Sequence, residues 1–233
     1  MKINNRSIQN LENKHRMKKI VLFSIALFIG FSGIAQDSAK EAKQLLDKVS
    51  QKMGSYTNMF IGFTSVLENK EAGITDEAPI KGTITISGEK YNLDYLGNNF
   101  LFDGKNLAVI NHDEKEITIS NGDMEEEDGF IYPSKLLTFY NEGYNYTMGK
   151  LTNQNGRRIQ YVDLTPIDSN SEVIKVKLGI DAKSNHIYKL VQIGTNGAET
   201  TFTITKFNGS PSVSDDFFKL NKEKYKNKGY YID

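Results

Sequence analysis

Residues 82–110 read GTITISGEKYNLDYLGNNFLFDGKNLAVI, and this stretch decides the fold. An alternation with a period of two places side chains on one face of a pleated sheet. Asp103-Gly104, between two such runs, is a strong hairpin signal because a type I′ turn requires positive φ. The stretch therefore predicts an antiparallel meander with one apolar, aromatic-rich face. The apolar positions that alternate in its first two runs are Ile84, Ile86, Tyr91, Leu93 and Tyr95.

Similar runs continue the meander on both sides of this stretch. The longest of them includes Phe60 to Leu67, and Asn155-Gly156 and Asn196-Gly197 mark two further turns. A last short strand is expected over 216–220, followed by a polar, aromatic tail over 225–233. About eleven strands, spaced roughly ten residues apart, predict a mainly β protein with a large antiparallel sheet curled into a barrel or half-barrel.

Two segments have the pattern of helices. Residues 38–54 are predicted to form an amphipathic helix, with Gly54 at the C′ position. Its apolar side recurs at helical spacing, at Ala42, Leu45, Leu46, Val49 and Met53. Residues 130–140, FIYPSKLLTFY, predict a helix of about two turns that is too apolar to face water. It is expected to dock on the apolar face of the sheet, either as an ordinary core helix or as a movable cover.

The first 35 residues predict an export signal. Met17-Lys18-Lys19 precede an apolar run over 20–34, and small residues at Gly33 and Ala35 suit cleavage after Ala35. The alternative is a membrane anchor, but the run is shorter than the roughly 20 residues that a span needs. Residues 1–16 are polar, so Met17 is the expected true start. Residues 36–233 then form a single domain.

The composition limits the classes of partner and chemistry. The formal charge of zero includes six basic groups and one acidic group in the first 35 residues. Without them 23 basic and 28 acidic residues remain, a net charge of −5. Such a chain is not expected to bind nucleic acid. There is no cysteine, so the chain forms no disulfide and carries no lipid on a thiol. An exported chain of this kind suits the bacterial periplasm.

The residues that usually carry catalysis or bind metals are sparse. The histidines, His15, His112 and His186, lie apart, and no catalytic motif such as G-x-S-x-G or H-E-x-x-H is present. The acidic run NGDMEEEDG over 121–129 does not match the spacing of an EF-hand loop. A solvated loop is the simplest interpretation, and a calcium loop or a surface for a basic partner are alternatives. Neither an enzyme nor a metal site is predicted.

Several motifs, in order, resemble a known family. They are G-x-I-x-I at 82–86, D-G-K-x-L-x-V at 103–109, P-S-K-L-L at 133–137, V-D-L-T-P at 162–166 and the closing strands over 174–208. Together they resemble the periplasmic outer-membrane lipoprotein carriers, the LolA-like proteins. The resemblance implies an unclosed β-barrel capped by a long N-terminal helix and a short lid helix. It also implies a soluble, monomeric periplasmic carrier without a cofactor.

Such a carrier takes acylated lipoproteins from an inner-membrane ABC transporter complex to an outer-membrane acceptor. The resemblance implies two sets of residues in this chain. The acyl chains would contact Phe63, Ile84, Ile86, Tyr91, Leu93, Tyr95, Leu107 and Val109. The covers would present Leu45, Leu46 and Val49 from the long helix and Leu136, Leu137, Phe139 and Tyr140 from the lid.

One feature of the family pattern is missing. Well-studied members have an arginine after the G-x-I-x-I strand, and this arginine latches the lid by hydrogen bonds to carbonyl groups. Here the region reads Ser87-Gly88-Glu89-Lys90, and the Lys90 ammonium lacks the forked geometry of a guanidinium. Two alternatives to a carrier therefore stay open. One is a lipid-binding or envelope-sensing protein of the same fold that does not shuttle, and the other is a structural domain with a filled core.

Overall fold

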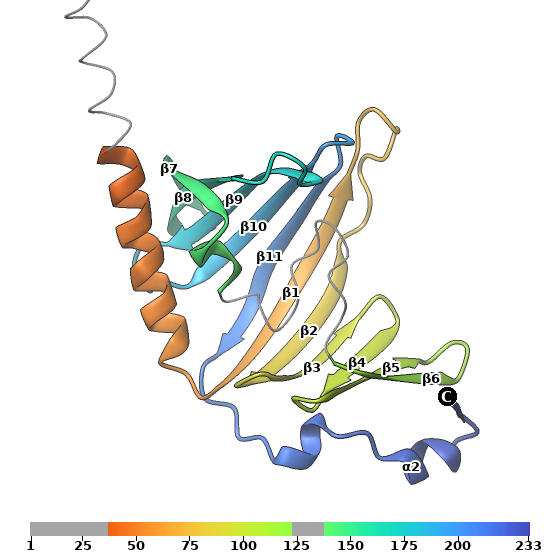
Figure 1. Cartoon of the computed structure of the whole chain (residues 1–233). Coiled ribbons are helices and arrows are strands. Elements are labelled where there is room, and N and C mark those ends of the chain that lie inside the picture. The colour runs from red at the N-terminus through yellow and green to blue at the C-terminus, as the bar shows by residue number, and fades with distance from the viewer. Residues whose placement is uncertain (1–36, 123–137) are drawn as a thin grey trace, which may run out of the picture.

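The computed structural model describes residues 37–122 and 138–233. These residues form one twelve-stranded sheet in the order β12-β6-β5-β4-β3-β2-β1-β11-β10-β9-β8-β7. The outermost strands, β12 and β7, do not pair with each other, so the sheet curves without closing (Figure 1). The pairing is antiparallel except between β12 and β6. The predicted mainly β, unclosed architecture is confirmed.

The strands follow the predicted runs closely. The first half of the sheet contains β1 (Asn58–Glu68), β2 (Ile80–Ser87), β3 (Lys90–Tyr95), β4 (Asn98–Phe102), β5 (Asn106–Asn111) and β6 (Glu116–Asn121). The second half contains β7 (Tyr144–Gln154), β8 (Arg157–Pro166), β9 (Val173–Asp181), β10 (Ile187–Gly194) and β11 (Glu199–Asn208). β1 pairs with both β2 and β11, and this pairing joins the two halves.

The turns show where local sequence controls the backbone. Asn155 and Gly156 both have positive φ, as a type I′ hairpin requires. At the predicted Asp103-Gly104 turn only Gly104 has positive φ. The Asp103 carboxylate instead accepts hydrogen bonds from the backbone N–H groups of Lys105 and Asn106, at 2.9 and 2.7 Å. The hairpin forms as predicted, but a side-chain-capped turn replaces the type I′ turn.

The N-terminal helix covers residues 37–54, as the sequence predicted. Figure 1 shows it along the β7–β10 half of the sheet. Four of its apolar side chains, Ala42, Leu46, Val49 and Met53, are at most 2% exposed. Gly54 is the last helical residue and lacks positive φ, so the expected left-handed C′ cap is not formed.

Most buried apolar side chains form a single cluster, here called the inner cluster. It joins the inward side of the helix to the face of the sheet that the helix covers, here called the inner face. From the sheet, β1 and β2 contribute Ile61 and Ile84, and β8 and β9 contribute Leu164 and Leu178. The inner cluster therefore extends over both halves of the sheet.

A second, smaller cluster lies at the β4–β6 end. Its buried members are Leu101, Ala108, Ile110 and Ile117. They alternate along β4 and β5 with inner-cluster residues such as Phe102 and Leu107, so they point to the other face of the sheet. The C-terminal segment covers them with Leu220, Tyr225, Tyr230 and Ile232.

The C-terminal segment differs from its prediction. The strand expected over 216–220 is a 3-10 helix, η2 (Asp215–Phe218), and the tail contains α2 (Lys222–Lys226) and β12 (Tyr231–Ile232). Phe218 is 1% exposed, so η2 is anchored by one buried ring rather than by an alternating face. The aromatic side chains of this polar tail therefore have a packing role, on the second cluster.

Several predicted segments lie wholly or partly outside the described residues. These are the export signal over 1–35, most of the acidic run over 121–129, and the greater part of the short helix over 130–140. The described end of that helix is a 3-10 turn, η1 (Phe139–Asn141). Within residues 37–122 and 138–233, no helix combines the length and hydrophobicity that a membrane span requires.

Candidate functional site

The structure brings most of the residues implied for lipid contact into the inner cluster. Five of them are at most 5% exposed: Ile84, Ile86, Tyr91, Leu93 and Leu107. The other three, Phe63, Tyr95 and Val109, are partly buried and pack against the cluster. The first group therefore forms a packed floor, and the second group keeps part of its apolar surface exposed.

The cover residues divide in the same way. Leu46 and Val49 of the N-terminal helix and Tyr140 of η1 are buried in the inner cluster. Leu45 and Phe139 are partly buried against it. Leu136 and Leu137 lie outside the described residues, so their role stays a prediction.

The partly buried side chains make a stripe across the inner face. We call Phe63, Tyr95, Phe100, Val109 and Phe202 the accessible stripe. The ring of Phe63 lies at its centre, with centroids 5.4 Å from Tyr95 and 6.0 Å from Phe202. The Tyr95 hydroxyl lies 2.7 Å from the hydroxyl of Ser65, which is 2% exposed. Each ring is thus fixed by neighbours while part of its surface stays open.

The first glycine of the G-x-I-x-I motif has a packing role at this stripe. Gly82 pairs with Phe63 across β1 and β2. A Cβ atom added at Gly82 would collide with the Phe63 ring, so the ring lies flat over the strand only because position 82 has no side chain.

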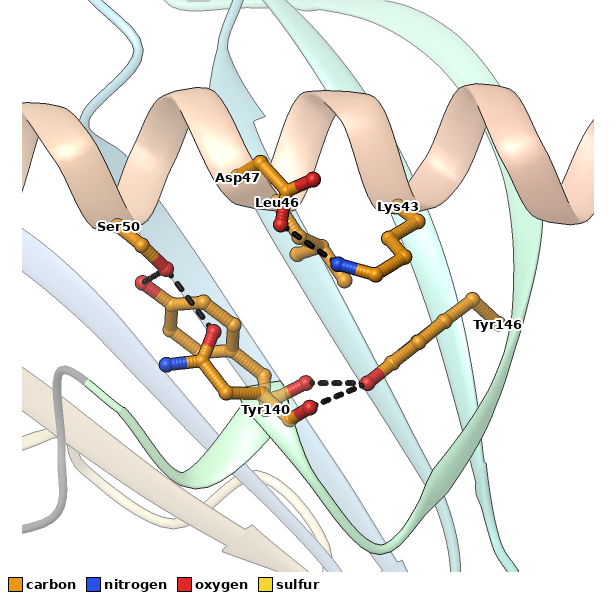
Figure 2. A pocket seen from close by; sticks show the side chains of 7 residues that line it. Lys43, Leu46, Asp47, Ser50, Tyr140 and Tyr146 are labelled. Atoms are coloured by element: carbon orange, nitrogen blue, oxygen red, sulfur yellow. Dashed lines mark hydrogen bonds and ion pairs between the residues drawn. The ribbon is translucent and has the colours of Figure 1, made fainter.

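A cavity lies where the helix, η1 and β7 meet. Its volume is about 280 Å³. Figure 2 shows its lining of Lys43, Leu46, Asp47, Ser50, Tyr140, Asn141 and Tyr146. Leu46 and Tyr140 also belong to the inner cluster, and the other five side chains carry polar groups. The cavity is therefore apolar where it meets the cluster and polar elsewhere.

Hydrogen bonds tie η1 to both of its neighbours at this cavity. The Ser50 hydroxyl of the helix lies 2.9 Å from Asn141 Oδ1 and 3.3 Å from the Tyr140 hydroxyl. The Tyr146 hydroxyl of β7 lies 3.0 Å from each of the carbonyl oxygens of Tyr140 and Asn141, to which it donates. Figure 2 shows these bonds converging on the turn.

The Tyr146 phenol thus contacts the kind of group that the family arginine would contact, the carbonyls of the cover. Lys90 has a different partner from these carbonyl groups. Its ammonium lies 3.0 Å from the Asp215 carboxylate of η2, and this ion pair lowers the pKa of Asp215 through its hydrogen bond and charge. The C-terminal segment therefore engages the Lys90 ammonium, and most of the predicted lid, over 130–137, lies outside the described residues.

The ionisable groups around the cavity keep it close to neutral. The Lys43 ammonium lies 2.8 Å from the Asp47 carboxylate, one helical turn away. Burial raises the pKa values of Tyr140 and Tyr146. The Lys43 charge acts against this rise in the pKa of Tyr146, and the charges of Asp47 and Glu142 add to it. Both phenols therefore stay protonated at neutral pH and remain hydrogen-bond donors.

A histidine contacts the chain just after the C-terminal end of the N-terminal helix. The Tyr56 hydroxyl lies 2.8 Å from His186 Nε2, and the His186 ring lies 4.4 Å from that of Phe207. Burial lowers the pKa of His186, the Lys52 ammonium lowers it further, and Asp181 acts in the opposite direction. The neutral imidazole is therefore the form that the folded state prefers.

This contact predicts a loss of stability in mild acid. A histidine whose pKa is lower when folded stabilises the fold fully above its unfolded pKa of about 6.5, and this contribution is lost as the pH falls towards the folded pKa. Urea unfolding of the wild type should show this loss between pH 7.5 and pH 5.5. His186→Gln keeps a hydrogen-bond acceptor but cannot titrate, so we expect a smaller loss. An equal loss in both proteins would contradict the assignment.

Metal chemistry finds no support in the described part of the chain. Within residues 37–122 and 138–233, no three His, Asp or Glu side chains are grouped so as to hold a metal ion. The same residues leave no buried side-chain nitrogen or oxygen without a hydrogen-bond partner. The described features of the site are therefore its apolar surface and its polar cavity.

Comparison with known proteins places this arrangement among solved folds. No protein-family model matches the sequence, and no curated protein is detectably similar to it. The structure is similar to an uncharacterized conserved protein from Thermus thermophilus, with a TM-score of 0.55 and 9% identity over 83% of this chain and 98% of that one.

Two further solved structures are similar at lower TM-scores. A putative outer membrane lipoprotein-sorting protein domain from Vibrio parahaemolyticus has a TM-score of 0.44 and 13% identity, over 81% of this chain and 99% of that one. A LolA superfamily protein from Nitrosomonas europaea has a TM-score of 0.40 and 11% identity, over 78% and 98%. At these identities the likeness is one of fold alone. The unclosed, mainly β fold with a long N-terminal helix, which the motif resemblance implied, is the fold of this chain.

Proposed function

We propose that this chain is a soluble periplasmic carrier of lipoprotein acyl chains. It takes an acylated lipoprotein from an inner-membrane ABC transporter complex, holds the acyl chains on the inner face, and delivers them to an outer-membrane acceptor. The accessible stripe contacts the chains, the buried residues of β2, β3 and β5 support it, and the N-terminal helix with η1 covers them. No cofactor and no catalytic step are part of this role.

The observation that carries the proposal is the inner cluster of an unclosed sheet. Four aromatic side chains packed against this cluster, Phe63, Tyr95, Phe100 and Phe202, keep part of their surface open on the covered face. Sites for apolar ligands have this character, being lined mainly by aromatic and aliphatic groups with few polar ones. The LolA-like motifs in the sequence favour acyl chains as the ligand.

The energetics explain why such a carrier is required. Burial of an acyl chain stabilises it by about 0.8 kcal/mol per CH₂, so a sixteen-carbon chain is held in a bilayer by roughly 12 kcal/mol. Three such chains on one lipoprotein would almost never cross water unaided. A carrier must offer apolar surface comparable to lipid and still release it, which suits a cover held by a few hydrogen bonds such as those of Tyr146 and Ser50.

The experiment uses a synthetic lipopeptide with an N-acyl-S-diacylglyceryl cysteine. Binding to the purified protein is measured by native mass spectrometry without detergent, and transfer is measured between donor and acceptor vesicles that carry different fluorophores. We expect a one-to-one complex and transfer whose rate rises with protein concentration.

The remaining outcomes separate the alternatives. A complex without transfer would overturn the shuttle and support a lipid-binding or envelope-sensing protein of the same fold. No complex at all would overturn lipid binding and support a structural domain with a filled core.

A further inference from the structure

The cavity at the helix, η1 and β7 adjoins the inner cluster that packs on the inner face. Leu46 and Tyr140 contribute to both, with side chains that are 2% and 0% exposed. The volume of about 280 Å³ is too small for a whole lipid, since ligand sites usually measure about 300–1,000 Å³. It is large enough for the part of a lipid where the chains join.

The polar side of the cavity has a specific charge balance. Its seven lining residues include one cation, Lys43, and one carboxylate, Asp47, and these two form an ion pair. The cavity therefore has no positive charge in excess.

Hydrogen-bonding capacity remains despite this balance. The Lys43 ammonium has three N–H donors, and its described ion pair engages one carboxylate oxygen. Ser50, Asn141 and the two phenols add hydroxyl and amide groups around the same space (Figure 2). These groups could form hydrogen bonds with a carbonyl or hydroxyl of a ligand while the Lys43–Asp47 ion pair stays intact.

We propose that this cavity receives the uncharged polar junction of the ligand, a glyceryl ester or amide, and selects it over the phosphate of a phospholipid. This selection rests on the proposed function, because it assumes that the acyl chains occupy the inner face. An ester carbonyl accepts from Lys43 and leaves Asp47 in place. A phosphate monoester would compete with Asp47 for the same ammonium and would lie beside that carboxylate.

The selection should be modest, because both members of the ion pair are largely exposed. We expect the wild type to bind dioleoylglycerol about threefold or more tighter than dioleoyl phosphatidic acid, which has the same chains. Affinities are measured by displacement of a fluorescent fatty acid at low ionic strength. The N-acyl-S-diacylglyceryl peptide is a third competitor, so that a free glyceride and a lipoprotein terminus are distinguished as sources of the same chemistry.

Asp47→Asn tests the charge balance directly. It removes the carboxylate, keeps the size of the side chain and frees Lys43, so the preference for the neutral lipid should fall about threefold or disappear. Asp216→Asn is the matched control. It frees Lys219 from a similar exposed pair of 3.1 Å in η2, away from the cavity, and should leave the preference unchanged.

Two results would overturn the selection while leaving the proposed function intact. These are equal binding of the neutral and the anionic lipid by the wild type, and an equal change in Asp47→Asn and Asp216→Asn. Failure of all three lipids to displace the probe would overturn the proposed function, and the selection with it.

Discussion

Replacing Leu46 with alanine is expected to lower the free energy of unfolding by about 2–5 kcal/mol, the usual range for a buried leucine. Leu46 is 2% exposed and lies between the helix and the inner face. An isolated helix of this length is marginal in water, so packing on the sheet must supply most of its stability. Urea unfolding followed by circular dichroism and tyrosine fluorescence measures the loss, since the chain has no tryptophan.

The neighbouring leucine provides a matched control. Leu45 is the preceding residue of the same helix, and its substitution by alanine removes the same atoms. Unlike Leu46, it is only partly buried. We expect Leu45→Ala to cost less than half as much as Leu46→Ala, because less apolar surface is returned to water and a smaller cavity is left. Equal losses would contradict the docking of the helix through its Leu46 side.

The sheet was predictable because its information is local. An alternation such as Ile84, Ile86, Tyr91 and Leu93 fixes which side chains share a face, and the turns between the runs fix which strands are neighbours. The structure pairs Ile84 with Leu93 and Ile86 with Tyr91, as one apolar face requires. The amphipathic helix over 37–54 was predictable for the same reason.

The sequence did not predict how deeply each side chain of the inner face is buried. Leu93 and Tyr95 have the same alternation, yet Leu93 is 5% exposed and Tyr95 is partly open. The difference depends on which elements cover each level of the curved sheet, and that is decided by contacts between distant segments. The sequence therefore identified the apolar face and could not separate its floor from its accessible stripe.

The polar cavity was missed for a similar reason. Ser50 meets Asn141 across 91 positions, and Lys43 and Tyr146 come from a helix and a strand that no motif connects. Tyr146 resembled any other strand tyrosine in the sequence. The missing family arginine was a signal that another group contacts the cover, but nothing in the sequence showed which group. The C-terminal segment was misjudged because its polar composition hid four packed apolar side chains.

Val109→Glu is expected to reduce acyl-chain affinity at least tenfold while the protein stays folded. Val109 lies in the accessible stripe, where β5 pairs it with Phe100 of β4. It is partly buried, so a glutamate there can keep its carboxylate in water when no ligand is bound. A bound acyl chain would cover that carboxylate, and desolvation of an unpaired charge costs far more than the roughly 1.4 kcal/mol that a tenfold change represents.

Ile174→Glu is the control that gives this result its meaning. Ile174 is also a β-branched aliphatic residue in a strand, β9, but it is 50% exposed and does not belong to the inner cluster. Both variants gain the same charge, so any general effect of net charge on lipid binding appears in both. Displacement of a fluorescent fatty acid, with urea unfolding to confirm the fold, should show loss of affinity in Val109→Glu alone. If Val109→Glu binds as tightly as Ile174→Glu, the acyl chains do not lie on the accessible stripe. A ligand would then have to enter elsewhere, or the open aromatic surfaces would have only a packing role.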